Sequence, residues 1–91
     1  MEKAVQILVE GRVQGVFFRK FVKDSALKFG VNGFIKNLHD GSVQCFCVGS
    51  ERSLKNILEQ IRVGPPGAKV EKVTVTNVEL KEKFSSFQIR N

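Results

Sequence analysis

The stretch VQILVEGRVQGVFFRKFVKDSALKFG, residues 5–30, decides the fold because the spacing of its apolar residues changes partway along. Val5, Ile7 and Val9 alternate with other residues, and this period of two predicts a half-buried strand. The alternation breaks at Gly11, and apolar residues then recur at helical spacing until Gly30, a suitable helix stop. The residues on this helical stripe are Phe18, Phe21, Val22, Ala26, Leu27 and Phe29.

The remaining sequence repeats the same two patterns. Strands are predicted over residues 33–37 and 43–48, separated by the turn signal Asp40-Gly41. A helix capped by Ser50 or Ser53 follows and stops at a Gly-Pro-Pro-Gly run at residues 64–67. Its apolar stripe is Leu54, Ile57, Leu58 and Ile61. Alternation of β-branched residues over 70–78 predicts a fourth strand, and residues 87–90 can form a short closing strand. The order β-α-β-β-α-β, with a short terminal strand, predicts a ferredoxin-like α+β sandwich: a mainly antiparallel sheet with two helices on one face.

Composition excludes several classes of protein. The 91 residues fit one domain spanning residues 1–91, and 42 % hydrophobic residues exclude intrinsic disorder. No apolar run approaches the ~20 residues that cross a bilayer, and the first residues lack the pattern of a signal peptide. Two cysteines are too few for a disulfide scaffold. We therefore expect a soluble cytoplasmic domain in which Cys45 and Cys47 are free, buried and on one face of a strand.

The charge is positive and uneven. Fifteen Lys and Arg against nine Asp and Glu give a net charge of +6. Between residues 11 and 36 the six cations Arg12, Arg19, Lys20, Lys23, Lys28 and Lys36 face one acid, Asp24. This segment should attract an anion such as a phosphorylated small molecule, nucleic acid or a membrane surface. For the lysines of the predicted helix the alternative is an ordinary solvated face.

The loop at residues 11–19, GRVQGVFFR, leaves a strand and enters a helix N-terminus. Free backbone N–H groups and the positive end of the helix dipole meet there, which favours an anion. Gly11 and Gly15 permit tight turns, and the planar fork of Arg19 can hold two phosphate oxygens. Spacing alone leaves open a plain glycine-containing connection with a surface arginine.

Other catalytic patterns are absent from the sequence. It holds no Walker A loop and no Gly-x-Gly-x-x-Gly, and neither cysteine has an arginine six residues on. Asp24 and Asp40 are not clustered, and nothing in the spacing supports a relay through His39, which we expect to be exposed. We therefore expect chemistry without a metal, a cofactor or a covalent intermediate.

Two long motifs carry a resemblance to a known family. Residues 11–19 and residues 33–43, GFIKNLHDGSV, with Gly49 six residues later, resemble the two signatures of the acylphosphatases. Similarity continues through residues 64–68 and 87–90, so it covers essentially the whole chain. The small single-domain prokaryotic members are the ones it resembles. The resemblance implies the ferredoxin-like fold and hydrolysis of the carboxyl-phosphate bond of small acyl phosphates to carboxylate and phosphate.

The resemblance also implies roles for particular residues. Arg19 matches the family's phosphate-binding arginine, and Asn37 matches its water-orienting asparagine. The family's phosphate cradle is matched by the backbone amides of five loop residues: Gln14, Gly15, Val16, Phe17 and Phe18. The chain departs from the family pattern at Phe17, where small residues are common, and at Ile35, where valine is usual. The expected partner is a small acyl phosphate or inorganic phosphate, with no nucleic acid or membrane, and the expected state is a monomer.

Two other functions remain as alternatives. RNA-recognition modules share this topology, but they need aromatic residues on the exposed sheet face, and the sequence shows no such strand motif. The second alternative is a weakly catalytic binding domain, because the hydrogenase maturation factor that processes carbamoyl phosphate carries a similar N-terminal domain. The final strand is complete when the sequence reaches Asn91, which favours an autonomous enzyme.

Overall fold

The computed structural model describes residues 2–90, which form five strands and two helices. These elements are β1 (Lys3–Arg12), α1 (Phe18–Phe29), β2 (Asn32–Asn37), β3 (Val43–Gly49), α2 (Glu51–Val63), β4 (Lys69–Val78) and β5 (Phe87–Arg90). The helices begin and end where the sequence signals predict: Gly30 terminates α1, and the hydroxyl of Ser50 caps α2 by accepting a hydrogen bond from the amide of Ser53 at 3.1 Å. Within the described residues, neither helix is long and apolar enough to cross a membrane.

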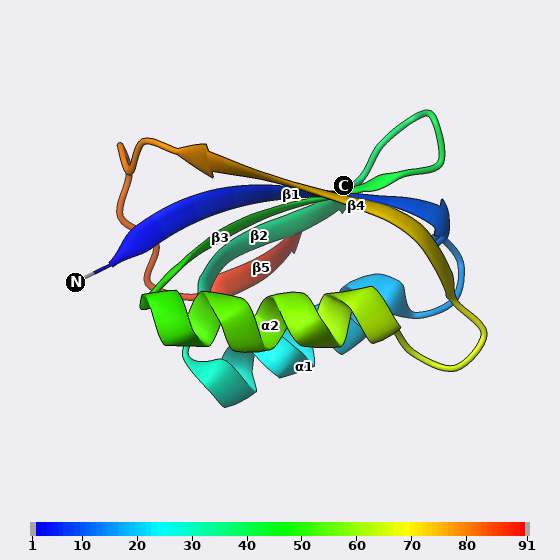
Figure 1. Ribbon diagram of the computed structural model, residues 1–91, viewed down its shortest axis with the longest axis horizontal. Helices are drawn as coiled ribbons and strands as arrows, with labels where there is room; N and C mark the ends of the chain where they lie inside the picture. Colours follow the sequence, from blue (N-terminus) through cyan, green and yellow to red (C-terminus); the bar gives the residue numbers. More distant parts are fainter. Residues whose placement is uncertain (1, 91) are drawn as a thin grey trace.

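The strands form one sheet in the order β4-β1-β3-β2-β5. The pairs β1/β3, β1/β4 and β2/β3 are antiparallel, and β5 adds to the edge parallel to β2. Both helices cover the same face of the sheet (Figure 1). The predicted ferredoxin-like sandwich is therefore confirmed, with β5 as an additional strand.

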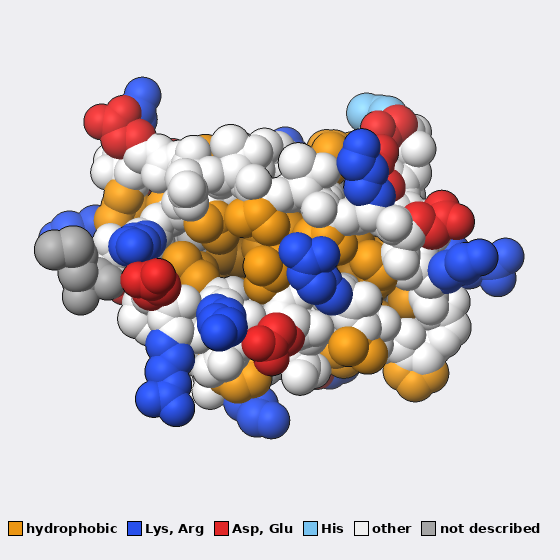
Figure 2. Space-filling model, in the orientation of Figure 1, with side chains coloured by type: hydrophobic (Ala, Val, Ile, Leu, Met, Phe, Trp, Pro, Cys, Tyr) orange, Lys and Arg blue, Asp and Glu red, His pale blue; other side chains and the backbone are white. Residues whose placement is uncertain are grey.

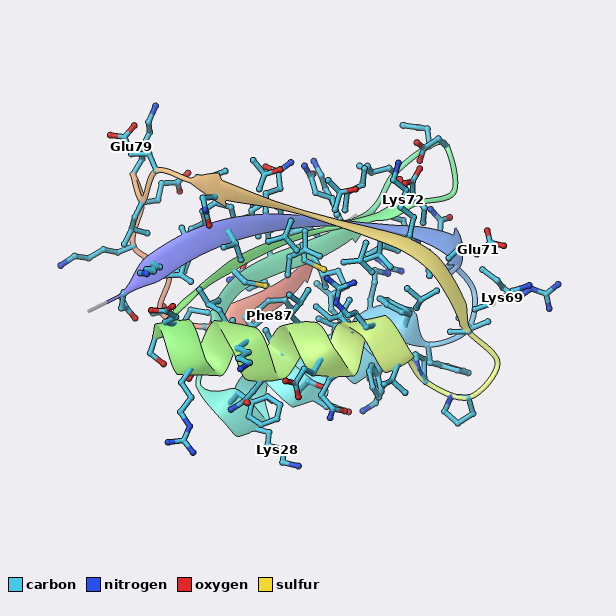
Figure 3. The ribbon with its side chains drawn as sticks, in the orientation of Figure 1. Lys28, Lys69, Glu71, Lys72, Glu79 and Phe87 are labelled. Carbon is cyan, nitrogen blue, oxygen red and sulfur yellow. The ribbon has the colours of Figure 1, made fainter. Side chains whose placement is uncertain are left out.

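The core lies between the sheet and the helices. Cys45 pairs with Ile7 and Cys47 with Val5 on the covered face, and both cysteines are free and fully buried as predicted. Phe87 of β5 is also buried there, whereas Lys28 points from α1 into solvent (Figure 3). One prediction for the helical stripe is wrong: Leu27 is 68 % exposed, because its neighbour Ala26 is the residue that faces the sheet.

Several strands extend beyond the residues that the sequence predicted: β3 ends one residue later, at Gly49, β4 begins one residue earlier, at Lys69, and the changes in β1 and β2 have identifiable causes. The strand β1 continues past Gly11 to Arg12, because a register shift between Glu10 and Gly11 restores its pairing with β4. At the start of β2, Asn32 belongs to the strand rather than to a loop. Its side-chain amide donates a hydrogen bond to the carbonyl of Phe84 at 2.8 Å. A long-range contact of this kind leaves no mark in the local pattern.

Gly33 allows β2 and β3 to approach closely. Its φ is 136°, and a Cβ atom at this position would lie 1.8 Å from the carbonyl oxygen of Phe46. Only glycine combines that backbone angle with that spacing. The pairing of β2 with β3, which positions Asn37 at the end of β2, therefore depends on Gly33 near the start of the same strand.

The uncovered face of the sheet carries a cluster of aromatic side chains that the sequence analysis did not identify. Phe34 and Phe46 stack at 5.7 Å between ring centroids, and Phe84 packs against both rings. The guanidinium of Arg90 lies 4.1 Å from the centroid of Phe34. These contacts join β2, β3 and β5 to the segment that precedes β5.

A shallow apolar groove follows the other edge of the sheet. Figure 2 shows orange side chains gathered along the line between β4 and α2, with charged residues around them. Its apolar lining is Val5, Ile7, Leu54, Leu58 and Val75. Because β4 and β5 are opposite edges of the sheet, this groove is separate from the site described next.

Candidate active site

The loop between β1 and α1 is braced against the hairpin that joins β2 to β3. The side-chain amide of Gln14 donates to the carbonyl of Leu38 at 2.8 Å and to the carbonyl of Ser42 at 2.9 Å. Both carbonyls lie in the turn that follows Asn37. The side chain of Gln14 therefore fixes the loop relative to the end of β2, which brings the two signature segments together.

The first turn of α1 begins with an unusual backbone conformation. Phe17 is the N-cap residue and has φ 59° and ψ 25°, the left-handed region. Within residues 2–90 it is the one non-glycine residue with positive φ. No side chain of the described residues caps this helix end, and its first turn contains no acidic residue. The amides at the start of α1 are therefore left without a side-chain acceptor, as an anion site requires.

Arg19 stands in this first turn and contacts the C-terminal strand. Its Nη1 donates a hydrogen bond to the backbone carbonyl of Arg90 at 3.1 Å. A guanidinium has five N–H donors, so the remaining donors stay available for a ligand. The contact with β5 fixes the direction of the Arg19 side chain, and the packing of Arg90 on Phe34 holds that end of β5 in turn.

Asn37 ends β2 on the face that the helices cover. It pairs with Val43, a core residue, whereas Lys36 pairs with Gln44 on the opposite face, as the alternation of side chains along a strand requires. The Oδ1 atom of Asn37 is buried and has no hydrogen-bond partner among the described residues. A buried acceptor without a partner is costly, and such atoms occur where a water or ligand is to be bound.

A depression of about 300 Å³ collects these groups at one end of the molecule. Its lining residues are Val13, Gly15, Phe17, Phe18, Arg19, Lys20, Asn37 and Ile89. Arg19 and Asn37 lie 18 positions apart in the sequence, and the fold brings both to the same concave surface together with the loop. A polar side formed by Arg19 and Asn37 thus adjoins an apolar rim, the arrangement typical of small-molecule sites.

The structure separates the predicted site residues into two groups. Arg19, Asn37, Gly15, Phe17 and Phe18 line the depression, whereas Gln14 and Val16 do not. The side chain of Gln14 braces the hairpin, and Val16 packs against the core.

Sequence reasoning missed Lys20 and Ile89 as lining residues. The sequence names Lys20 only among the cations of residues 11–36, with a solvated helix face as the alternative, and its exposed ammonium pairs with Asp24 at 3.0 Å. Its place directly after Arg19 was the available signal. For Ile89 the sequence contained no signal, because it reaches the site only through the pairing of β5 with β2.

Asp40 stabilises the turn that follows Asn37. Its Oδ1 accepts hydrogen bonds from the hydroxyl and from the backbone amide of Ser42. These bonds lower the pKa of Asp40 from its usual value. His39 beside it is exposed, as predicted. These hydrogen bonds hold the turn in place directly after Asn37, and neither Asp40 nor His39 lines the depression.

Within residues 2–90 no three His, Cys, Asp or Glu side chains gather in a way that could hold a metal ion. The two thiols lie in the core, away from the depression, and burial raises the pKa of Cys47 to about 12. The groups that the site presents are thus a guanidinium, an amide side chain and backbone amides, because the ammonium of Lys20 is paired with Asp24. Such groups bind anions and orient water.

Comparisons with known proteins agree with this geometry. An acylphosphatase from Pyrobaculum calidifontis is 45 % identical over 84 residues, which cover 91 % of this chain and 76 % of that protein. The crystal structure of acylphosphatase from Bacillus subtilis matches with a TM-score of 0.95 and 37 % identity over the full length of both chains. Full-length HypF, solved with phosphate and nucleotide bound, matches with a TM-score of 0.87 and 29 % identity, covering all of this chain but 12 % of that one. The family model for acylphosphatase matches residues 5–89. The chain belongs to the acylphosphatase family, whose members hydrolyse acyl phosphates.

Proposed function

We propose that Arg19 and the backbone amides at the start of α1 bind the phosphoryl group of a small acyl phosphate, and that Asn37 orients the attacking water. The observation that carries the proposal is the unpartnered, buried Oδ1 of Asn37 in the same depression as Arg19. One group would hold the phosphate, and the other would hold the nucleophile. Residues 1–91 would act as one catalytic domain.

The reaction needs positioning more than a strong base. An acyl phosphate is a mixed anhydride with a good carboxylate leaving group, so alignment and charge stabilisation supply most of the rate. A bound water would donate a hydrogen bond to Oδ1 of Asn37, and its oxygen would form the new bond to phosphorus. The bond between phosphorus and the acyl oxygen would break, and the carboxylate would leave with the electron pair.

The proton of the water would pass to a phosphate oxygen, since the amide of Asn37 is a poor proton acceptor. The guanidinium of Arg19 and the loop amides would stabilise negative charge as it develops on the phosphoryl oxygens. Among the loop residues, Gly15, Phe17 and Phe18 line the depression. Their amides, together with those of Gln14 and Val16, would form the phosphate cradle. None of these steps uses a metal or a cofactor.

The chain is proposed to act as a monomer in the cytoplasm on a small-molecule substrate. Two free buried cysteines suit a reducing compartment. The aromatic pair on the open sheet face does not argue for nucleic acid, because Phe46 stacks against the ring of Phe34 and Arg90 lies over it. A base would therefore have to displace contacts that the protein already makes.

The test is hydrolysis of benzoyl phosphate by the wild-type chain and by Asn37→Ala, with a stable phosphate monoester as the control substrate. We expect the wild type to hydrolyse the acyl phosphate alone, with and without a chelator. Asn37→Ala should lower turnover by roughly 10²-fold or more while retaining affinity for inorganic phosphate.

Three outcomes would count against the proposal. Equal loss of phosphate affinity in Asn37→Ala would show that Asn37 binds the phosphate instead of the water. Inhibition by chelator that an added metal reverses would contradict the metal-free mechanism. Binding of phosphate by the wild type without turnover of acyl phosphate would make the chain an anion-binding module.

A further inference from the structure

We propose that Phe17, together with Ile89, forms a contact surface for the acyl group, and that it makes the site selective for acyl phosphates with an apolar, especially aromatic, acyl group. This inference rests on the proposed function, since it takes the phosphoryl group to lie against Arg19 and the loop amides. It concerns the other half of the substrate.

The first observation is the exposure of Phe17. Its side chain is 82 % exposed, the largest exposed fraction among the large apolar side chains of the described residues. Phe18 beside it is 1 % exposed and belongs to the core. Phe17 therefore contributes almost nothing to the packing of the fold, although it occupies a conformation that non-glycine residues rarely adopt. A rare backbone conformation without a packing benefit indicates a role outside the fold.

The second observation is where apolar surface remains within the depression. Val13 and Phe18 line it but are each 1 % exposed, so they offer little area to a ligand. Ile89 is 41 % exposed and is the other apolar side chain at the rim with substantial free surface. Phe17 comes from the start of α1, and Ile89 from the edge strand β5. An acyl group that extends out of the depression would be contacted by these two side chains.

The third observation concerns charge at the rim. Lys20 lines the depression, but its ammonium is already paired with Asp24 at 3.0 Å. This pair has no net charge, so it offers little attraction to an acyl group that carries a carboxylate or a second phosphate. The free surface near the acyl group is therefore mainly apolar, and burial of apolar area would favour a ring or a branched chain over a methyl or a charged group.

The experiment compares kcat/KM for benzoyl phosphate and acetyl phosphate in the wild type and in Phe17→Asn. Asparagine tolerates the left-handed conformation better than other non-glycine residues, so this variant removes the ring and keeps the backbone. We expect the benzoyl-to-acetyl ratio of kcat/KM to fall about five-fold, the size expected when an aromatic contact is lost. Phe17→Leu and Ile89→Thr should each give a smaller fall in the same ratio.

The matched control is Leu27→Asn. Leu27 is another exposed apolar residue of α1, but it does not line the depression, so the ratio should stay as in the wild type. An equal loss of rate on both substrates in Phe17→Asn would overturn the inference, because it would mean that Phe17 only shapes the loop. An unchanged ratio would overturn it as well. If the wild type hydrolysed neither substrate, the proposed function itself would fail, which is a separate result.

Discussion

At the scale of single residues, the proposed function gives Arg19 two tasks, which would use different donors of the same guanidinium. Its Nη1 donates to the carbonyl of Arg90 at 3.1 Å, and the same side chain lines the depression. A fixed planar fork can satisfy both demands at once. A lysine ammonium has three donors at a single point, so it cannot hold the β5 carbonyl and two phosphate oxygens in the same geometry.

This difference predicts the behaviour of two variants. Arg19→Ala should abolish measurable phosphate binding and activity. Arg19→Lys should restore the charge but raise the dissociation constant of phosphate about ten-fold or more, the range for a lost charge-assisted hydrogen bond. Calorimetric titration with inorganic phosphate measures both. Phosphate binding by Arg19→Lys equal to that of the wild type would show that charge alone is sufficient.

At the scale of elements, the site exists because a loop and a hairpin are fastened together through Gln14. Its amide donates to two carbonyls, those of Leu38 and Ser42. Gln14→Ala removes both hydrogen bonds and leaves the two carbonyls without this donor. It should lower the free energy of unfolding by about 1–3 kcal/mol and weaken phosphate binding. Chemical denaturation and phosphate titration give the two values.

Gln14→Glu is the matched comparison for this brace. It has the same length, but its carboxylate would face two carbonyl oxygens and cannot donate to either, so it should be worse than Gln14→Ala. If Gln14→Glu were instead as stable as the wild type, the two hydrogen bonds would not be what fastens the loop.

The pairing of β2 with β3 gives a second prediction at this scale. Gly33→Ala should destabilise the fold by about 2 kcal/mol or more, because its Cβ would collide with the carbonyl of Phe46 at a positive φ. Gly41→Ala separates the two effects: φ is 93° there, but nothing lies within 4 Å of the added atom. Gly41→Ala should lower the free energy of unfolding by about 1 kcal/mol, which is the cost of the positive φ without a collision. Thermal or denaturant unfolding measures the loss of stability in both variants. Equal losses in Gly33→Ala and Gly41→Ala would show that the collision with Phe46 is unimportant.

The elements differ in how far the sequence could predict them. Both helices were predicted well because each has an apolar stripe and a stop signal, Gly30 for α1 and the Gly-Pro-Pro-Gly run for α2. The placement of Asn32 and Leu27 was wrong. Asn32 belongs to β2 because it pairs with Val48 of β3, and its side chain bonds a carbonyl 52 positions away. The rotation of α1 about its axis is set by packing against the sheet. Local spacing contains neither kind of information.

The candidate site divides in the same way. Arg19 and Asn37 were identified because both lie in long motifs, and the loop between β1 and α1 follows from the order of the elements. Ile89 and the carbonyl of Arg90 were not identified, because they enter through β5, and no pattern within residues 87–90 indicates which strand it will join. Their contribution is visible only once the order of the sheet is known.

At the scale of the whole molecule, the buried thiols make stability depend on alkaline pH. Burial raises the pKa of Cys47 from its usual value near 9 to about 12. The pKa of Cys45 is also raised, mainly by burial and to a smaller extent by the charge of the neighbouring Cys47. The folded state keeps the neutral thiols, whereas the unfolded chain ionises near its ordinary pKa. The stabilisation is therefore complete below about pH 9 and is lost as the pH rises towards 12.

We expect Cys47→Ala to lower the free energy of unfolding at pH 7, because it leaves a small cavity, and to flatten its decline above pH 9. Denaturant unfolding at several values of pH, compared with the wild type, measures both effects. A decline as steep as that of the wild type would mean that other groups cause the alkaline loss.

The uncapped start of α1 has a consequence for the thermodynamics of the whole chain. An anion bound there would supply the acceptor that no side chain provides, and it would bind the native state but not the unfolded one. Free phosphate at 100 times its dissociation constant should then raise the free energy of unfolding by about 2.7 kcal/mol. The wild type should have a higher melting temperature in phosphate than in chloride of equal ionic strength. In Arg19→Ala the two melting temperatures should be the same. The product of the reaction would thus act as a folding ligand, and the fraction of native protein would depend on the phosphate content of its surroundings.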